Sequence, residues 1–445
     1  MGKKWEEMSA EERQEARFNT WLSPSGIEFE SPEAEAAYKA RVTRCKDAVQ
    51  LKKTPDRVPV FPFFTFMPAD LYDVSPGEVM YDTEKLVSVW NKYLEDYRPD
   101  YYVSPGLVGT GKCFEVLDFK QYNWPGHGVA DSSGYQCIED EYMLADEYQA
   151  LIDDPSDFWF RSYLPRIFGA LEPLKTLPPF TDIWEMPLIC GHLIGFGVPE
   201  VQKALKALQE AGRLAFEWAG SIGQFEAGAQ AKGFVNGAGG ISKAPYDILA
   251  DTLRGTRNMM SDMFRRPDTV LKAIERIIPL AIKQGLAGVK FSGNPIAFLP
   301  LHKGADGFMS DEQFKTFYWP GLKAVILGLI EEGCVPLLFA EGGYNSRLEY
   351  LKELPRGHCI WLFDRTDMVQ AKELLGDTTC IAGNVPASLI LTGTPDQVKD
   401  CCKDLVDTAG KGGGYIMSSG TSLDQGKPDT LHAMIDFTKE YGVYR

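Results

Sequence analysis

The chain has 445 residues, and its 46 basic against 62 acidic side chains give a formal net charge of −16. This excess of negative charge argues against nucleic acid and anionic membrane surfaces as partners. Hydrophobic residues at 44% and charged residues at 24% are ordinary for a soluble globular protein. The length allows two or three domains, or one (β/α) barrel with insertions.

The first residues contain no apolar leader, and no apolar run approaches the eighteen residues or so that a membrane helix needs. Nine cysteines form no CxxC pair, and their number is odd. We therefore expect a cytoplasmic protein with reduced thiols and no membrane contact.

Residues 1–55 are charged and helix-prone. Ser9 followed by Glu12 has the spacing of a capping box, in which each side chain bonds the other residue's backbone N–H. We predict a helical N-terminal extension over 1–55 and a catalytic barrel over 56–445.

Eight short apolar runs follow, separated by longer amphipathic stretches such as the one that opens with Thr394 and Pro395. Buried parallel strands have this composition, and repeated strand–helix alternation predicts a parallel sheet. Eight strands favour a single (β/α)8 TIM barrel. Residues 106–232, rich in aromatic side chains, are interpreted as a loop insertion over the barrel mouth. The eight runs are 58–65, 101–105, 233–240, 288–293, 335–342, 358–364, 378–385 and 413–420.

Barrel enzymes carry their reactive groups at the carboxyl ends of the strands. Glu341, Asp364 and Asn384 end three of the predicted strands. Glu341 precedes a Gly-Gly turn, and its carboxylate is expected to face the barrel axis rather than to form a structural ion pair. For Asp364, capping of the next helix is an equal alternative.

The five histidines divide into two groups. His358 begins a predicted strand and His432 lies in a late helix, so both are interpreted as structural. His192 and His302 lie in predicted loops, where either is a candidate acid or base, although a satisfied loop histidine is the commoner outcome.

Several segments of the C-terminal half resemble, in order, the uroporphyrinogen decarboxylase superfamily, which also contains corrinoid-dependent methyltransferases. The similarity runs from about Arg57 to the end and is best from Gly233 onward. It implies one (β/α)8 barrel, in agreement with the strand count. The segments are Phe291–Gly293, Met309–Phe314, Tyr318–Lys323, Phe339–Gly342, Ile381–Val385 and Tyr415–Thr421.

At two places the chain departs from the motifs of the superfamily, and each departure argues against one of the superfamily's activities for this chain. The decarboxylases carry an arginine-containing segment after the first strand that binds porphyrin carboxylates, whereas Phe63–Asp70 contains no arginine. The thiol methyltransferases hold zinc at positions that correspond here to Phe339, Glu341 and Thr421. Because phenylalanine cannot ligate zinc, we expect no bound metal.

The resemblance then favours the O-demethylase type, which moves a methyl group from a methoxylated, usually aromatic, donor to the cobalt of a separate corrinoid protein. The chain lacks the Asp-x-His-x-x-Gly motif of corrinoid proteins. We expect no tightly bound cofactor and a corrinoid (cobalamin) protein docking at the C-terminal face, with a homodimer left open. The alternatives are a decarboxylase of a small or tetrapyrrole acid, and a non-catalytic ligand-binding barrel.

O-demethylation must expel a phenolate, whose conjugate acid has a pKa of about 10. A carboxylic acid in an apolar setting can supply the proton. Glu341 is the first candidate acid and His192 the second, while Asp364 and Asn384 are candidates to orient the substrate. Core packing is the alternative for each member of a predicted aromatic wall, which comprises Phe66, Met67, Trp124, Tyr344 and Trp361.

Overall fold

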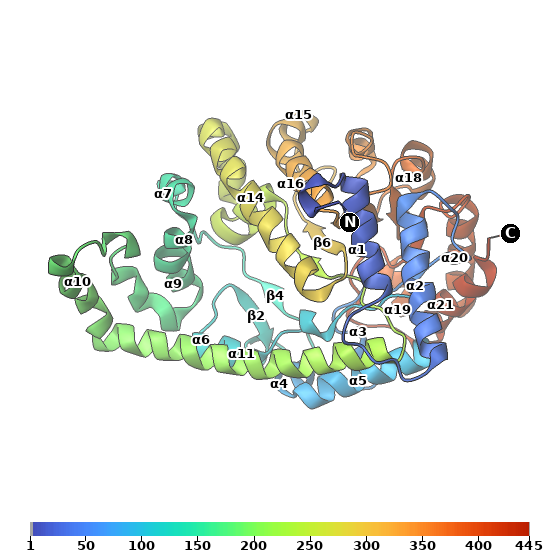
Figure 1. Ribbon diagram of the computed structural model, residues 1–445, viewed down its shortest axis with the longest axis horizontal. Helices are drawn as coiled ribbons and strands as arrows, with labels where there is room; N and C mark the ends of the chain where they lie inside the picture. Colours follow the sequence, from blue (N-terminus) through green and yellow to red (C-terminus); the bar gives the residue numbers. More distant parts are fainter. Residues whose placement is uncertain (1–2, 445) are drawn as a thin grey trace.

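The computed structural model describes residues 3–444, which fold around a curled parallel sheet (Figure 1). Its seven strands run in the order β1-β10-β9-β8-β7-β6-β5, and every neighbouring pair is parallel. This is the α/β arrangement of a TIM-like barrel. The strands are β1 (Val60–Phe61), β5 (Gly240–Ile241), β6 (Ile296–Leu301), β7 (Val335–Ala340), β8 (Ile360–Phe363), β9 (Cys380–Ala382) and β10 (Tyr415–Ser418).

The segment around Tyr102 lies between the two edge strands of this sheet. The Tyr101 amide donates to the Val60 carbonyl at 3.2 Å, and the Tyr102 amide donates to the Val235 carbonyl at 3.1 Å. Tyr102 also forms a parallel bridge with Asn236, just before β5. The predicted strand at 101–105 is thus reduced to one bridge, which links β1 to the chain entering β5.

The predicted strand at 288–293 is wrong. These residues form the last turn of the helix α14 (Pro267–Ser292), which Gly293 ends with a positive φ of 73°. Phe291 is 95% exposed, so its apolar character does not reflect burial. The strand lies further along, at β6, where Pro300 weakens the sequence signal because proline is rare inside sheets.

Glycines let the backbones of α14 and β5 touch. A Cβ at Gly240 would lie 2.4 Å from the Gly285 carbonyl oxygen, and one at Gly288 would lie 2.5 Å from the Gly240 Cα. Any larger residue would push the helix away from the strand.

Helices surround the sheet in the expected strand–helix order (Figure 1). The predicted start of α20 is confirmed, since Thr394 forms a capping box with Gln397. After β1 come α3 (Met67–Asp70), α4 (Pro76–Tyr81) and α5 (Thr83–Tyr97); after β5, α12 (Pro245–Asp247), η7 (Ile248–Arg254), α13 (Thr256–Arg265) and α14; after β6, α15 (Asp311–Gln313) and α16 (Trp319–Glu331). The later helices are α17 (Leu348–Leu351), α18 (Met368–Leu375), α19 (Ala387–Thr392), α20 (Pro395–Thr408) and α21 (Pro428–Tyr441).

Helices α1 (Ala10–Leu22) and α2 (Pro32–Gln50) lie at the amino ends of the strands. Arg13 donates to the Glu331 carbonyl at 2.7 Å, and Gln14 contacts the His358 ring at 3.1 Å. The capping box of Ser9 and Glu12 is present as predicted. The division of the chain at residue 55 stays a prediction.

The 106–232 segment, predicted as a loop insertion, consists largely of helices. In Figure 1 its helices α7 to α10 lie at the far left, away from β6, and α11 runs along the lower edge. Near the mouth, the Tyr135 ring lies 5.5 Å from Phe66. The segment contains α6 (Gly111–Leu117), α7 (Tyr148–Asp153), α8 (Pro155–Phe158), α9 (Leu164–Ile167), α10 (Met186–Leu193), α11 (Pro199–Ala231), β2 (Tyr122–Pro125), β3 (Gly128–Val129) and β4 (Gln136–Cys137).

The nine cysteines are all free thiols. Within residues 3–444, no helix combines the length and the apolar character needed to cross a bilayer.

Candidate active site at the barrel mouth

Three phenylalanine rings meet inside the barrel, one from just after β1 and the other two from β6 and β7. The ring centroid of Phe63 lies 4.9 Å from that of Phe339 and 5.3 Å from that of Phe298. The three side chains are all buried. Because successive strand residues alternate between faces, these rings identify which face of each strand points to the interior. We call them the phenylalanine floor.

The same alternation, continued one or two residues beyond the strand ends, predicts polar groups above the floor. Phe298 leads to His302 by way of Pro300, and Phe339 leads to Glu341. The register of the neighbouring strands extends the pattern around the barrel. The resulting mouth ring consists of Lys243, His302, Glu341, Asp364 and Asn384.

Glu341 lies at the end of β7, beside His302 at the end of the neighbouring strand β6. Its Oε1 is 3.8 Å from His302 Nε2, and its side chain is 44% exposed. Burial raises the pKa of Glu341, and the nearby carboxylates of Asp251 and Asp364 raise it further. The positive charges of His302 and Lys243 lower it, but the net shift is upward. A carboxyl group in this setting holds its proton to higher pH than an ordinary glutamate and can act as a general acid.

His302 is held from its other side by Asp251, whose Oδ2 lies 2.5 Å from Nδ1. Burial opposes a positive charge on the ring, but the hydrogen bond and charge of Asp251 outweigh it, so the pKa of His302 is raised. Lys243 Nζ contacts the same Asp251 oxygen at 2.7 Å. Burial disfavours the Asp251 carboxylate, yet these two partners hold its pKa below the usual range.

Asp247 fixes the loop that carries His302. It is fully buried and accepts the backbone amides of His302 at 3.0 Å and Lys303 at 3.1 Å. The Tyr318 hydroxyl donates to it at 2.8 Å. Burial and the nearby Asp251 charge raise its pKa. Its contacts orient the imidazole without reaching the mouth themselves, so Asp247 is a positioning residue.

Asp364 and Asn384 lie at the strand ends that form the mouth, and one polar side-chain atom of each bonds to backbone. Asp364 Oδ2 accepts the Gly342 amide at 3.0 Å, just after Glu341. Asn384 Nδ2 donates to the carbonyls of Asp364 at 3.0 Å and Thr366 at 2.8 Å. Both residues thus hold the turns that carry the mouth ring, and their contact with a substrate stays a prediction.

The predicted aromatic wall is dispersed. Trp361 pairs in register with Leu338, which neighbours Phe339 and therefore points away from the interior. Tyr344 lies 6.5 Å from Trp361, and both are fully buried. Phe66 and Met67 follow β1 near the mouth and are also buried. These side chains fill the core, so the structure does not form them into one exposed stacking surface.

His192 and Trp124 lie in the 106–232 segment instead of in the mouth ring. His192 is part of α10, at the far end of the molecule in Figure 1. Trp124 stacks on His127 with centroids 4.4 Å apart. The structure therefore does not bring His192 to Glu341. His302 occupies the place that the sequence interpretation gave to His192.

No group of three or more histidine, cysteine, aspartate or glutamate side chains in residues 3–444 is placed to hold a metal ion. At the position of a zinc ligand in the thiol methyltransferases, Phe339 belongs to the phenylalanine floor. The absence of stoichiometric zinc stays a prediction, and metal analysis of protein purified without chelator tests it.

Replacing Asp251 with asparagine is expected to lower the pKa of His302. The substitution removes the charge that raises this pKa and leaves the opposing burial in place. Titration of the histidine resonances by NMR measures the midpoint. Asp436→Asn is the matched control, because Asp436 contacts the exposed His432 ring at 3.0 Å. An unchanged His302 midpoint in Asp251→Asn would contradict the assignment.

A family model described as uroporphyrinogen decarboxylase (URO-D) matches residues 236–441, the part that carries the whole mouth ring. A uroporphyrinogen decarboxylase from Saccharophagus degradans is 29% identical over 194 residues, which are 43% of this chain and 53% of the relative. One from Coxiella burnetii is 20% identical over 186 residues, 41% of this chain and 50% of the relative. The chain thus matches about half the length of these curated relatives.

A solved structure of a methyltransferase from Methanosarcina mazei is similar in fold, with a TM-score of 0.57 and 15% sequence identity. The similarity covers 90% of this chain and 98% of that one. At this identity, the match supports the barrel architecture and leaves the activity open.

Sequence reasoning missed the positioning residues of the mouth. Asp247 and Asp251 are four residues apart, which places them on one face of a helical turn. That spacing was the available signal. No sequence pattern pointed to Lys243, because the strand before it, β5, is only two residues long and begins with glycine.

Proposed function

We propose that the protein is a methyltransferase. Its similarity to the uroporphyrinogen decarboxylase superfamily is confirmed by the family match. The proposed donor is a methoxylated, aromatic compound, and the proposed acceptor is the cobalt of a separate corrinoid protein. The observation that carries the proposal is Glu341, a carboxyl group with a raised pKa that lies 3.8 Å from His302 at the mouth.

The reaction needs a proton at the ether oxygen. When the methyl–oxygen bond breaks, the oxygen keeps the electron pair, and a phenol is released only if a proton arrives. Glu341 supplies that proton in the proposal. The charged His302 then stabilises the resulting carboxylate, and Asp251 holds the ring in position at 2.5 Å. The phenylalanine floor keeps water from below the reacting groups.

The methyl acceptor must reach the mouth from outside. Glu341 and His302 retain 44% and 32% exposure of their side chains, which fits an acceptor presented at the C-terminal face. A corrinoid bound by the partner would supply the nucleophilic cobalt. The chain itself lacks the Asp-x-His-x-x-Gly motif.

Methyl transfer is expected only when both substrates are present. Purified protein is mixed with methoxybenzoates, methoxyphenols or small methylamines and with reduced corrinoid protein or free cob(I)alamin. Formation of methylcobalamin is followed by absorbance, and omission of either substrate should abolish it. The proposal fails if no donor is turned over while a porphyrinogen is decarboxylated.

Decarboxylation is the competing activity, because the curated relatives carry that name. A tetrapyrrole with many carboxylates needs guanidinium partners. The segment after β1, Phe63–Asp70, offers none. The same preparations assayed for carbon dioxide release from porphyrinogens and small acids distinguish the two activities.

A further inference from the structure

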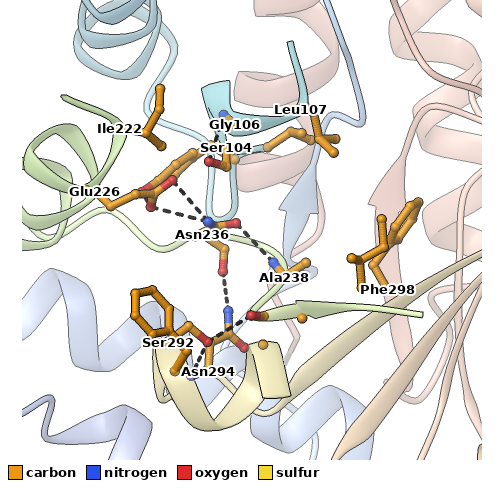
Figure 2. Close-up of a pocket in the computed structure, with 18 of the residues that line it drawn as sticks. Ser104, Gly106, Leu107, Ile222, Glu226, Asn236, Ala238, Ser292, Asn294 and Phe298 are labelled. Carbon is orange, nitrogen blue, oxygen red and sulfur yellow. Dashed lines mark hydrogen bonds between the residues drawn. The ribbon is translucent and has the colours of Figure 1, made fainter. Parts of the chain in front are cut away.

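A cavity lies between α11, α14 and the chain entering β5 (Figure 2). It has a volume of about 760 Å³, within the range of small-molecule sites. Phe63 and Phe298 of the phenylalanine floor form part of its inner wall. Of the described residues that line the cavity, none belongs to the mouth ring.

The cavity wall is largely apolar and carries a single charge. The side chains of Ile222, Leu107 and Phe298 line it from three different elements. Among its lining residues within 3–444, none is lysine, arginine or histidine, and Glu226 is the only acidic one. Carboxylates and phosphates are poor ligands for such a wall, because burial costs them their hydration and nothing there neutralises them.

Glu226 is held in place but keeps room for another donor. The Tyr102 hydroxyl donates to Oε2 at 2.6 Å, and Asn236 Nδ2 lies 3.2 Å from both oxygens. A carboxylate group has about four lone-pair sites, so Oε1 can accept a further hydrogen bond. Asn236 is fixed in turn, since Asn294 Nδ2 donates to its carbonyl at 2.8 Å (Figure 2). Burial raises the pKa of Glu226, although Ser104, Tyr102 and Asn236 favour its charged form.

We propose that this cavity is a binding site, separate from the mouth, for an apolar ring-sized molecule that carries an N–H or O–H donor to Glu226. The apolar wall supplies most of the binding, and Glu226 orients the ligand. The proposal does not depend on the methyltransferase function, because the cavity and the mouth ring share no polar residue.

The test uses N-phenyl-1-naphthylamine, an apolar fluorescent probe with one N–H group. Gly223 lines the cavity on α11, and a Cβ there would meet no atom within 4 Å. Gly223→Leu therefore fills the cavity while favouring the helix. We expect the affinity of Gly223→Leu for the probe to be lower by about ten-fold or more, because the leucine occupies space in which the probe would bury apolar surface.

Gly212→Leu is the matched control. Gly212 lies on the same helix, its Cβ would also meet no atom within 4 Å, and it does not line the cavity. This variant should bind the probe as the unsubstituted protein does. Equal binding by Gly223→Leu and Gly212→Leu would place the probe elsewhere on the surface and overturn the proposal. So would a failure of the unsubstituted protein to bind the probe.

Glu226→Gln tests the polar contact separately. We expect it to lower the affinity for the amine by about ten-fold, because the acceptor of the probe's N–H changes from a charged carboxylate to a neutral amide. The hydrocarbon 1-phenylnaphthalene, measured by its displacement of the amine, should lose no affinity. A melting temperature on each preparation confirms folding. Equal weakening of both probes would overturn the role of Glu226.

Discussion

Replacing Glu341 with glutamine is expected to lower the turnover of methyl transfer by roughly 10² to 10⁴-fold, the usual loss on removing a general acid. The substitution is nearly isosteric, and the Glu341 side chain is 44% exposed, so the fold should be retained. The KM for the donor should change less than kcat, because the proton is needed mainly in the transition state. Rates and a melting temperature are measured on the same preparation.

The pH dependence adds a second readout. Glu341 acts in its protonated form, and burial raises its pKa. The rate of the unsubstituted protein should therefore fall as the pH rises through this raised pKa, whereas the residual rate of Glu341→Gln should not show that step. Glu373→Gln is the control, since Glu373 is an exposed carboxylate on α18. Near-normal turnover in Glu341→Gln would remove Glu341 from the chemistry.

The sequence located Glu341 because its strand is unambiguous. All six residues of β7 are buried, and the strand stops one residue before the carboxylate. β8, β9 and β10 also lie inside their predicted runs. Buried parallel strands have continuous apolar sequences, so the strands in this half of the barrel can be predicted from the sequence.

The sequence did not identify His302 as the residue beside Glu341, because the preceding strand was misplaced. Apart from Lys290, the last turn of α14 consists of small and apolar residues and resembles a strand in sequence, while the true strand β6 contains Pro300. With the strand placed at 288–293, His302 falls in the middle of a loop. With the strand at Ile296–Leu301, it is the first residue after a strand end and lies beside Glu341.

The 106–232 segment shows what one sequence cannot supply. Its aromatic residues indicate a packed structure but not the direction in which that structure extends. Trp124 packs with Phe114, their centroids 5.6 Å apart, inside the segment. His192 lies on α10, beyond the barrel (Figure 1). Their positions depend on tertiary contacts between elements, which leave no local pattern.

Replacing Asp100 with alanine is expected to destabilise the protein by about 3–5 kcal/mol, as when one partner of a buried ion pair is removed. Asp100 is 1% exposed and lies 2.7 Å from Arg44 on α2 and 2.7 Å from Arg57 before β1. Without the carboxylate, Arg57 loses its ion pair and Arg44 keeps its contact with the exposed Asp56, so two largely buried guanidinium groups face each other with less compensating charge. The free energy of unfolding, from urea titration, measures the loss.

Asp56→Ala is the matched control. Asp56 also contacts Arg44, at 2.6 Å, but it is 64% exposed. Solvent screens exposed pairs, so this variant should lose at most about 1 kcal/mol. Losses of equal size in the two variants would contradict the buried network as the cause.

The stabilisation by Asp100 should also depend on pH. Burial disfavours its charge, but Arg57 and Arg44 outweigh this and lower its pKa. Because the folded state binds this proton more weakly than the unfolded state, the stabilisation is complete above the ordinary aspartate pKa of about 3.9. It is lost as the pH falls towards the lowered pKa. The difference in unfolding free energy between the unsubstituted protein and Asp100→Ala should therefore shrink in acid, and a pH-independent difference would show that packing, and not charge, holds α2 to the barrel.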